Sequence, residues 1–253
     1  MTELPEPSGR AALITGASRG IGYGIAEALV ARGDRVCITG RGEDALKEAV
    51  ERLGSDRVIA VAGKAHDPAH QAEAVERTMA AFGRVDYLVN NAGTNPVFGP
   101  LADLDLGVAR KVFETNVISA LGLAQQTWHA WQKDNGGAIV NIASVAGLAP
   151  SPFIGAYGVS KAALINLTQQ LAHEFAPRVR VNAIAPAVVK TKFARALYEG
   201  REEEAAAAYP LGRLGVPSDV GGAAAFLTSG QSDWITGQTI VLDGGMFLNA
   251  GVG

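Results

Sequence analysis

Hydrophobic residues along the 253-residue chain follow two patterns that alternate from one end to the other. Short, continuous apolar runs predict buried strands, and longer stretches with an apolar residue near every third or fourth position predict helices. The predicted strands are Arg10–Thr15, Arg35–Thr39, Arg57–Ala62, Asp86–Asn90, Gly137–Ala143, Val179–Ile184 and Thr239–Leu242. The predicted helices are one that ends near Ala31, then Asp44–Leu53, Pro68–Phe82, Leu106–Lys133, Gly155–Ala176 and Ser218–Ser229.

Strands that alternate with helices and are apolar along their whole length are typical of a parallel sheet covered on both faces. The sequence therefore predicts an α/β fold, a doubly wound (Rossmann) parallel sheet of about seven strands flanked by helices. No repeat or linker-like change of composition divides the chain, so residues 1–253 are expected to form one domain. Residues 1–9 are expected to be a loose leader rather than a signal peptide, and residues 187–217, where the alternation is lost, a loop beside the substrate.

The composition excludes several classes of function. With 48% hydrophobic and 19% charged residues and a net charge of −3, the chain is expected to be soluble and to bind neither nucleic acid nor membrane. No apolar run approaches the ~20 residues that cross a bilayer. Cys37 is the only cysteine and the four histidines lack ligand spacing, so no disulfide and no metal site are expected. A cytoplasmic location is the expectation for such a chain.

A glycine-rich segment joins the first predicted strand to the first helix. It reads TGASRGIG from Thr15 to Gly22. Glycines allow a sharp turn and a close approach of the backbone to a pyrophosphate, and the helix N-terminus attracts its charge. A plain tight turn is the alternative. The residues of this segment that are expected to bind a dinucleotide are Gly16, Ser18, Arg19, Gly20, Ile21 and Gly22.

The residues after the second predicted strand indicate which dinucleotide is bound. A carboxylate at this position binds the ribose hydroxyls of NAD, whereas an arginine accommodates the 2′-phosphate of NADP. Here Gly40 and Arg41 offer no carboxylate and one cation, and Arg19 supplies a second. We therefore expect NADP(H), with two solvated surface arginines as the alternative.

The most informative stretch for chemistry is Ser144–Lys161, which reads SVAGLAPSPFIGAYGVSK. Tyr157 and Lys161 are four residues apart, which places them one turn apart on one face of the predicted helix. An ammonium beside a phenol is expected to lower the phenol pKa, so that the pair exchanges a proton near neutral pH. Ser144 ends a strand and can donate a hydrogen bond to an oxygen that gains charge. An ordinary surface pair is the alternative for Tyr157 and Lys161.

Taken in order, these motifs resemble those of the short-chain dehydrogenase/reductase family in its single-domain form. Besides the glycine-rich segment, the matching residues are NNAG at Asn90–Gly93, Asn116, Ser144, YGVSK at Tyr157–Lys161 and DGG at Asp243–Gly245. The resemblance covers essentially the whole chain. It implies an enzyme that transfers hydride between a nicotinamide cofactor and a ketone or secondary alcohol.

The resemblance also implies roles for individual residues. Tyr157 is similar to the family's acid/base, and Lys161 is similar to its partner, which also binds the nicotinamide ribose. Ser144 is similar to the residue that polarises the carbonyl. Asn116 is similar to the residue whose backbone holds a relay water. Further cofactor contacts are implied at Asn91, Ala92, Gly93, Pro186, Val188 and Thr191. Two positions depart from the pattern, with Lys64 in place of an aspartate near adenine and Ala187 in place of the glycine after Pro186.

The expected substrate side is apolar, which favours an apolar carbonyl compound over a sugar. Residues expected there are Val97, Phe98, Val145, Leu148, Phe153, Phe193, Leu197, Tyr198 and Tyr209, while 201–208 is expected to be an exposed helix of a lid. The chain is most similar in look to 3-oxoacyl-acyl-carrier-protein reductases. Arg178 matches a basic carrier-binding position, but Asp134 and Asn135 stand where another is usual. The alternatives are a dehydrogenase acting on a free small molecule and, least favoured, an NADP-binding protein without catalysis. The substrate, its stereochemistry and the direction of reaction do not follow from the sequence.

The family resemblance implies a homo-oligomer, a tetramer or at least a dimer, paired through the long helix and the Tyr157 helix. Trp128 and Trp131 lie three residues apart on the long helix, a large apolar load for an exposed surface. The alternative is that both face the sheet.

Overall fold

The structure is a computed structural model that describes residues 9–54 and 56–249, so the expected leader lies almost entirely outside it. Its seven parallel strands form one sheet in the order β3-β2-β1-β4-β5-β6-β7. They are β1 (Ala11–Ile14), β2 (Arg35–Gly40), β3 (Val58–Ala62), β4 (Tyr87–Asn90), β5 (Gly137–Ile142), β6 (Val179–Pro186) and β7 (Thr239–Leu242). The predicted fold class is confirmed, and every strand ends within two residues of its predicted bounds.

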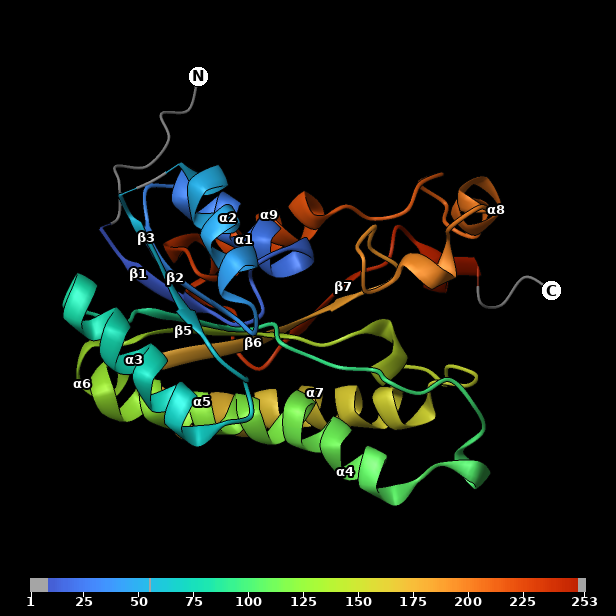
Figure 1. The fold of residues 1–253 in the computed structure, drawn as a ribbon, viewed down its shortest axis with the longest axis horizontal. Coiled ribbons are helices and arrows are strands. Elements are labelled where there is room, and N and C mark those ends of the chain that lie inside the picture. Colours follow the sequence, from blue (N-terminus) through green and yellow to red (C-terminus); the bar gives the residue numbers. More distant parts are fainter. Residues whose placement is uncertain (1–8, 55, 250–253) are drawn as a thin grey trace.

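Helices cover both faces of the sheet. They are α1 (Gly20–Ala31), α2 (Glu43–Leu53), α3 (Pro68–Phe82), α4 (Leu106–Phe113), α5 (Ser119–Thr127), α6 (Lys133–Asn135), α7 (Gly155–Phe175), α8 (Glu202–Ala207) and α9 (Pro217–Leu227). Helices α1, α2 and α9 lie over one face, and α3 to α7 over the other (Figure 1). No helix in the described part of the chain has the length and apolar content needed to span a bilayer.

Alternating side chains of each strand enter two separate cores. On β1, Ile14 belongs to the core beneath α1 and α9, whereas Leu13 belongs to the core beneath α3, α5 and α7. This is why the predicted strands are apolar throughout. The predicted long helix 106–133 is one helical path interrupted by wider π turns at Glu114–Ile118 and Trp128–Gln132. Apolar periodicity does not separate α from π turns, so the sequence did not predict them.

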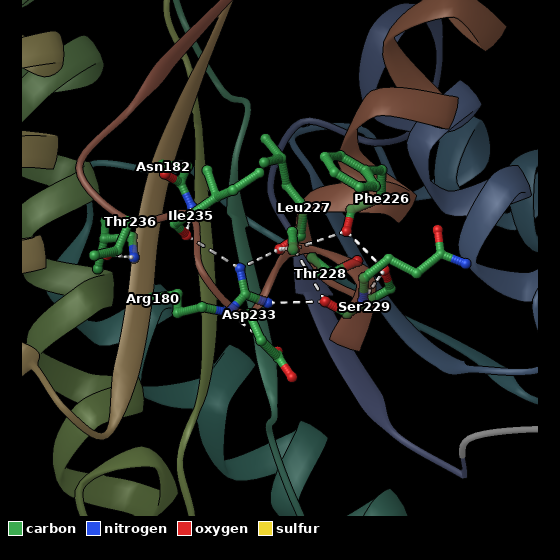
Figure 2. Close-up of polar contacts among 12 residues, drawn as sticks. Arg180, Asn182, Phe226, Leu227, Thr228, Ser229, Asp233, Ile235 and Thr236 are labelled. Carbon is green, nitrogen blue, oxygen red and sulfur yellow. Dashed lines mark hydrogen bonds and ion pairs between the residues drawn. The ribbon is translucent and has the colours of Figure 1, made fainter.

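Arg180, near the amino end of β6, fastens the segment between α9 and β7 (Figure 2). Its guanidinium donates to the carbonyl oxygens of Leu227 (2.9 Å) and Ser229 (3.1 Å). Asn182 on the same strand donates to Ile235 O at 2.8 Å. These contacts satisfy the carbonyl of Leu227, the last residue of α9, and two carbonyls of the segment that follows it. They lie at the amino edge of the sheet, away from the site described below.

Asp86, just before β4, accepts several hydrogen bonds at the amino edge of the sheet and stabilises the fold there. Its fully buried carboxylate accepts hydrogen bonds from Arg10, Arg84 and the backbone N–H of Ala11, at 2.6–3.0 Å. Burial raises the pKa of Asp86, but these donors outweigh it and hold the pKa below its usual value. Asp86→Asn should therefore destabilise the fold by about 1.5–3 kcal/mol at neutral pH.

The sign of the pH dependence follows from the lowered pKa. The stabilisation is complete above the unfolded pKa of about 3.9 and is lost as the pH falls through the lower folded value. In urea denaturation, the free energy of unfolding of wild type should thus exceed that of Asp86→Asn at neutral pH. This difference should narrow only in strong acid. The exposed Asp134→Asn is the matched control. A gap already closed at pH values of about 6 would contradict this account.

Candidate active site

The expected site residues meet at the carboxyl edge of the sheet. The strand order reverses between β1 and β4, and ligands of such folds bind in the crevice at this point. The loops after β1, β4 and β5, together with the end of β6, all open at this edge. Residues distant in sequence are thereby gathered around one crevice.

The glycine-rich segment has the shape of a phosphate cradle. Gly16 and Gly20 have φ of 63° and 61°, which glycine adopts at little cost. A Cβ on Gly22 would lie 2.5 Å from Nδ2 of Asn91 and 2.7 Å from Gly16 O, so a side chain there would force this segment and the loop after β4 apart. Helix α1 begins at Gly20 and directs its unpaired N–H groups into the space. The residues present therefore fit a dinucleotide pyrophosphate.

Thr15, at the end of β1, fixes this segment to the loop after β4. Its Oγ1 accepts hydrogen bonds from the N–H groups of Asn91 (3.0 Å) and Ala92 (2.9 Å). Nδ2 of Asn91 in turn donates to the carbonyls of Thr15 and Gly16. Thr15 was not predicted as a site residue. The sequence feature that could have identified it is a hydroxyl residue directly after a fully apolar strand.

Three exposed cations lie at the ends of β1, β2 and β3. Arg19 precedes α1, and Arg41 directly follows β2. Gly40 pairs with Ala62, and Gly63 N–H donates to Gly40 O at 2.8 Å, so Lys64 follows close to Arg41. These cations therefore lie where the ribose of a bound dinucleotide is expected, with the exposed Glu43 and Asp44 following in the first turn of α2.

The segment after β6 closes over the cradle. The methyl group of Thr191 would lie 3.3 Å from a Cβ on Gly20, so Thr191 packs on the start of α1. Val188 N–H donates to the hydroxyl of Tyr209 at 3.3 Å. Tyr209 was expected to border the substrate, but it is buried, because it supports this loop from within.

Ser144, Tyr157 and Lys161 converge as expected. Ser144 follows β5, and its Oγ accepts from Ala146 N–H at 3.2 Å, which leaves its proton for another acceptor. Ser144 and Tyr157 lie close enough for the serine hydroxyl to lower the pKa of the phenol. The Nζ of Lys161 lies 5.6 Å from the centroid of the Tyr157 ring and donates to Ile142 O at 2.7 Å.

The electrostatics differ from the expectation that Lys161 lowers the pKa of Tyr157. Burial raises the pKa of the Tyr157 phenol, and the hydrogen bond with Ser144 offsets this only in part. Burial also lowers the pKa of Lys161 to about 8. Lys161 is thus still mostly protonated at neutral pH, but it releases its proton more readily than an ordinary lysine, and its ammonium donates to a carbonyl. In this arrangement the phenol keeps its proton at neutral pH.

Two glycines hold Ser144 against α7. A Cβ on Gly147 would lie 2.7 Å from the backbone of Lys161, and one on Gly158 would lie 2.7 Å from Ala146 O. Any side chain at either position would separate the turn Val145–Gly147 from α7. The Ser144–Tyr157 distance therefore depends on both glycines, which were not predicted as site residues.

Asn116 lies in the π turn of the long helix, a type of irregularity frequent at functional sites. Its side chain is buried, accepts from Thr94 N–H at 2.8 Å, and donates to Ser160 Oγ at 2.9 Å. Ser160 donates to Tyr157 O at 2.7 Å. Asn116 thereby ties the loop after β4 to the Tyr157 turn of α7.

An apolar hollow opens beside Tyr157. Its lining includes Val97, Leu101, Val108, Phe153 and Ile154. Of the other residues expected near the substrate, Phe98, Leu148, Phe193 and Leu197 are exposed, and Tyr198 donates from its hydroxyl to Thr191 O. Leu104, Val108 and Val112 also line the hollow and were missed, because their apolar spacing indicated only the core face of a helix.

Known proteins resemble this chain over nearly its whole length. The family model described as Enoyl-(Acyl carrier protein) reductase matches residues 16–247. Dehydrogenase/reductase SDR family member 4 of Caenorhabditis elegans is 38% identical over 94% of this chain and 95% of its own. The 3-oxoacyl-acyl-carrier-protein reductase FabG of Salmonella typhimurium is 37% identical over 95% and 98%. The structure of a short-chain type dehydrogenase/reductase from Mycobacterium ulcerans matches with a TM-score of 0.89, at 34% identity over 94% and 90%.

Proposed function

The chain belongs to the short-chain dehydrogenase/reductase family of oxidoreductases, which use a nicotinamide cofactor, and on this premise we propose that it is an NADP(H)-dependent carbonyl reductase or secondary-alcohol dehydrogenase. The observation that carries the proposal is the meeting of Ser144, Tyr157 and the buried Lys161 at one edge of the sheet, beside the phosphate cradle.

In the direction of reduction, Tyr157 donates its proton to the carbonyl oxygen of the substrate. Its raised pKa supports this role, because the phenol is protonated at neutral pH. Ser144 donates a hydrogen bond to the same oxygen, which carries more charge in the transition state than in the ground state, so the contact accelerates the step. When bound, the cofactor supplies the hydride.

Two further residues complete the proposed proton path. Lys161 orients Tyr157, binds the cofactor ribose and exchanges protons readily, since its pKa is lowered to about 8. Asn116 positions the Tyr157 turn through Ser160, and its backbone is proposed to hold a relay water.

Ser144→Ala should lower kcat by about 10²- to 10³-fold, equivalent to about 2.7–4 kcal/mol, because one donor to the developing oxyanion is lost. Steady-state assays with a saturating ketone measure the effect. Ser229→Ala, at the opposite edge of the sheet, is the matched control and should leave kcat unchanged. A Ser144→Ala enzyme within threefold of wild type, on the order of 0.6 kcal/mol, would remove Ser144 from the mechanism.

We further propose that the cofactor is NADP(H), held by Gly16, Ser18, Arg19, Gly20, Ile21, Gly22, Arg41, Asn91, Ala92, Gly93, Tyr157, Lys161, Pro186, Val188 and Thr191. The exposed Arg19 and Arg41 support this choice, as does the absence of a carboxylate at Gly40 and Arg41, the end of β2 and the position directly after it. A guanidinium–phosphate contact is worth about 1.5–3 kcal/mol. NADPH should therefore bind about ten- to a hundredfold more tightly than NADH.

Arg41→Asp should reverse this preference, since a carboxylate repels the 2′-phosphate and binds ribose hydroxyls. Fluorescence titration with both cofactors measures the ratio, and Arg77→Asp on the exposed face of α3 is the control. Equal affinities of the wild type for the two cofactors would refute the choice of NADP(H).

Two substrates remain as candidates. The relatives' names include a 3-oxoacyl-acyl-carrier-protein reductase and a general dehydrogenase/reductase, so 3-oxoacyl thioesters and free apolar ketones both fit the family. Arg178 is exposed and suits an acidic carrier, whereas Asp134 is exposed and does not. A non-catalytic NADP-binding protein is least favoured, because the Ser144–Tyr157–Lys161 set is complete.

A panel of carbonyl compounds separates these candidates. It should include small ketones and an acyl-thioester mimic, assayed with and without acyl carrier protein. Turnover of the thioester that improves with the carrier supports carrier-bound substrates. Turnover that is equal with and without the carrier supports a free ketone as substrate. If no carbonyl compound is turned over with either cofactor, the proposed function is refuted.

We also propose a homo-oligomer, a dimer or tetramer, on the basis of the family. Trp128 and Trp131 do not support an oligomer. Trp128 stacks on Phe175 with centroids 4.3 Å apart, and Trp131 packs on the same core beneath the guanidinium of Arg84. Their apolar surface is thus covered within the chain, as in the alternative considered above. Light scattering at micromolar concentration tests the assembly.

A further inference from the structure

Phe153, two residues before α7, has an unusual backbone. Its φ is 65°, and no other non-glycine residue in the described part of the chain has a positive φ. A bulky side chain disfavours this left-handed conformation, because its Cβ crowds the following carbonyl oxygen. Such a residue persists only where its surroundings hold it, and such positions gather at functional sites.

The contacts that hold Phe153 come from the loop after β4. Gly99 N–H donates to Phe153 O at 2.8 Å. The ring of Phe153 lies against that of Phe98, with centroids 5.1 Å apart and planes tilted by 33°. A Cβ on Gly155 would lie 2.7 Å from Leu101 Cγ, so Leu101 packs directly on the start of α7. The loop after β4 and the entry to α7 are therefore one unit.

The conformation exposes aromatic surface beside the proposed acid. Phe98, Phe153 and Phe193 are 72%, 54% and 62% exposed, and they come from three separate segments. The Phe193 ring lies 6.2 Å from that of Tyr157, and Phe153 lines the hollow that Tyr157 also lines. Large exposed apolar groups that gather around a hollow indicate a binding site rather than a solvated surface.

The lining of the hollow also limits what it can bind. It contains no charged side chain, so a carboxylate or phosphate placed there would have no cationic partner. Aromatic rings attract other rings in tilted or offset arrangements, by about 0.5–1.5 kcal/mol beyond the burial of area. An uncharged carbonyl compound with a flat aromatic substituent fits both observations better than an acyl chain does.

On the basis of the function proposed above, we propose that Phe153 is a specificity-determining residue. Its left-handed backbone presents the ring, together with Phe98, to an aromatic substituent of the substrate while Tyr157 contacts the carbonyl oxygen. A residue in a relaxed backbone conformation would direct its side chain elsewhere. The strain is thus retained for selectivity and not for stability.

The test compares two ketones that differ only in the flatness of one ring, acetophenone and cyclohexyl methyl ketone. Wild type should have the higher kcat/KM for acetophenone. Phe153→Ala and Phe153→Leu should lower the acetophenone-to-cyclohexyl ratio about three- to tenfold, and Phe153→Tyr should keep it. Phe226→Ala, a partly exposed phenylalanine of α9, is the matched control and should not change the ratio.

Thermal unfolding supplies a readout that does not depend on activity. Phe153→Gly and Phe153→Ala both lack the ring, but only alanine retains the Cβ that disfavours the left-handed backbone. Phe153→Gly should therefore unfold at a Tm about 2–4 °C above Phe153→Ala, the reverse of the usual order. An equal or lower Tm would show that the backbone is not strained.

An unchanged ketone ratio in Phe153→Ala and Phe153→Leu, with wild type reducing both ketones, overturns the role of Phe153 alone. Selectivity of the wild type for a long acyl thioester over acetophenone also overturns it. If wild type reduces no carbonyl compound, the proposed function itself fails and the role of Phe153 fails with it.

Discussion

Replacing Tyr157 with phenylalanine should lower kcat by about 10²- to 10⁴-fold while cofactor affinity stays close to that of wild type. The ring still packs on α7 and near Phe193, but the proton that the carbonyl oxygen requires is absent. Burial keeps the wild-type phenol protonated at neutral pH, and this is the proton that the variant lacks.

Steady-state kinetics and NADPH titration together check this expectation. Tyr87→Phe, at the amino edge of the sheet, makes the same chemical change away from the site and should retain wild-type kcat. A Tyr157→Phe enzyme that loses affinity for NADPH in proportion to its rate would show a structural effect instead of a chemical one.

Lys161→Met should have opposite effects on stability and on activity. The buried ammonium has its pKa lowered to about 8, which means that its charge opposes folding. The apolar methionine removes this cost, at most about 3 kcal/mol, so the cofactor-free variant should be more stable than wild type at pH values of about 7. Its kcat should fall at least about 10²-fold and its NADPH affinity about tenfold, because Lys161 serves both.

The pH dependence of this stability difference has a definite sign. Below about pH 8 the lysine is protonated in both states, and the cost is complete. Between about pH 8 and the unfolded value near ~10.4 the folded protein releases its proton first, so wild type gains stability and the advantage of the variant shrinks. Denaturation curves across this range measure it, with Lys133→Met on exposed α6 as the control. A variant less stable than wild type at every pH would contradict this account.

The sequence predicted most of the fold because the five central strands are buried on both faces. Runs such as Ala11–Ile14 have no polar position, so their ends are marked by the first polar or glycine residue. That Ser144 lies near Tyr157 was also predictable. The end of a parallel strand and the start of the helix that follows it lie at the same edge of the sheet. The roles of the two residues remain predictions.

The features that sequence reasoning missed depend on tertiary contacts. The net rise of the Tyr157 pKa comes from burial, which residue spacing does not encode. Spacing also does not encode that Lys161 donates to Ile142 O. The burial of Tyr209 follows from a loop without periodicity. Phe153 gave no sign of a left-handed backbone, because glycine is the residue that usually marks one.

The central claim is that Tyr157 supplies the proton during hydride transfer, and single-turnover kinetics test it most directly. Stopped-flow absorbance follows NADPH oxidation with enzyme in excess over ketone, across pH, for wild type and Tyr157→Phe. The wild-type rate should be constant through neutral pH and fall in alkali as the phenol ionises, whereas the rate of Tyr157→Phe should be low and independent of pH. A Tyr157→Phe enzyme with the wild-type rate and pH profile would show that the proton comes from another group.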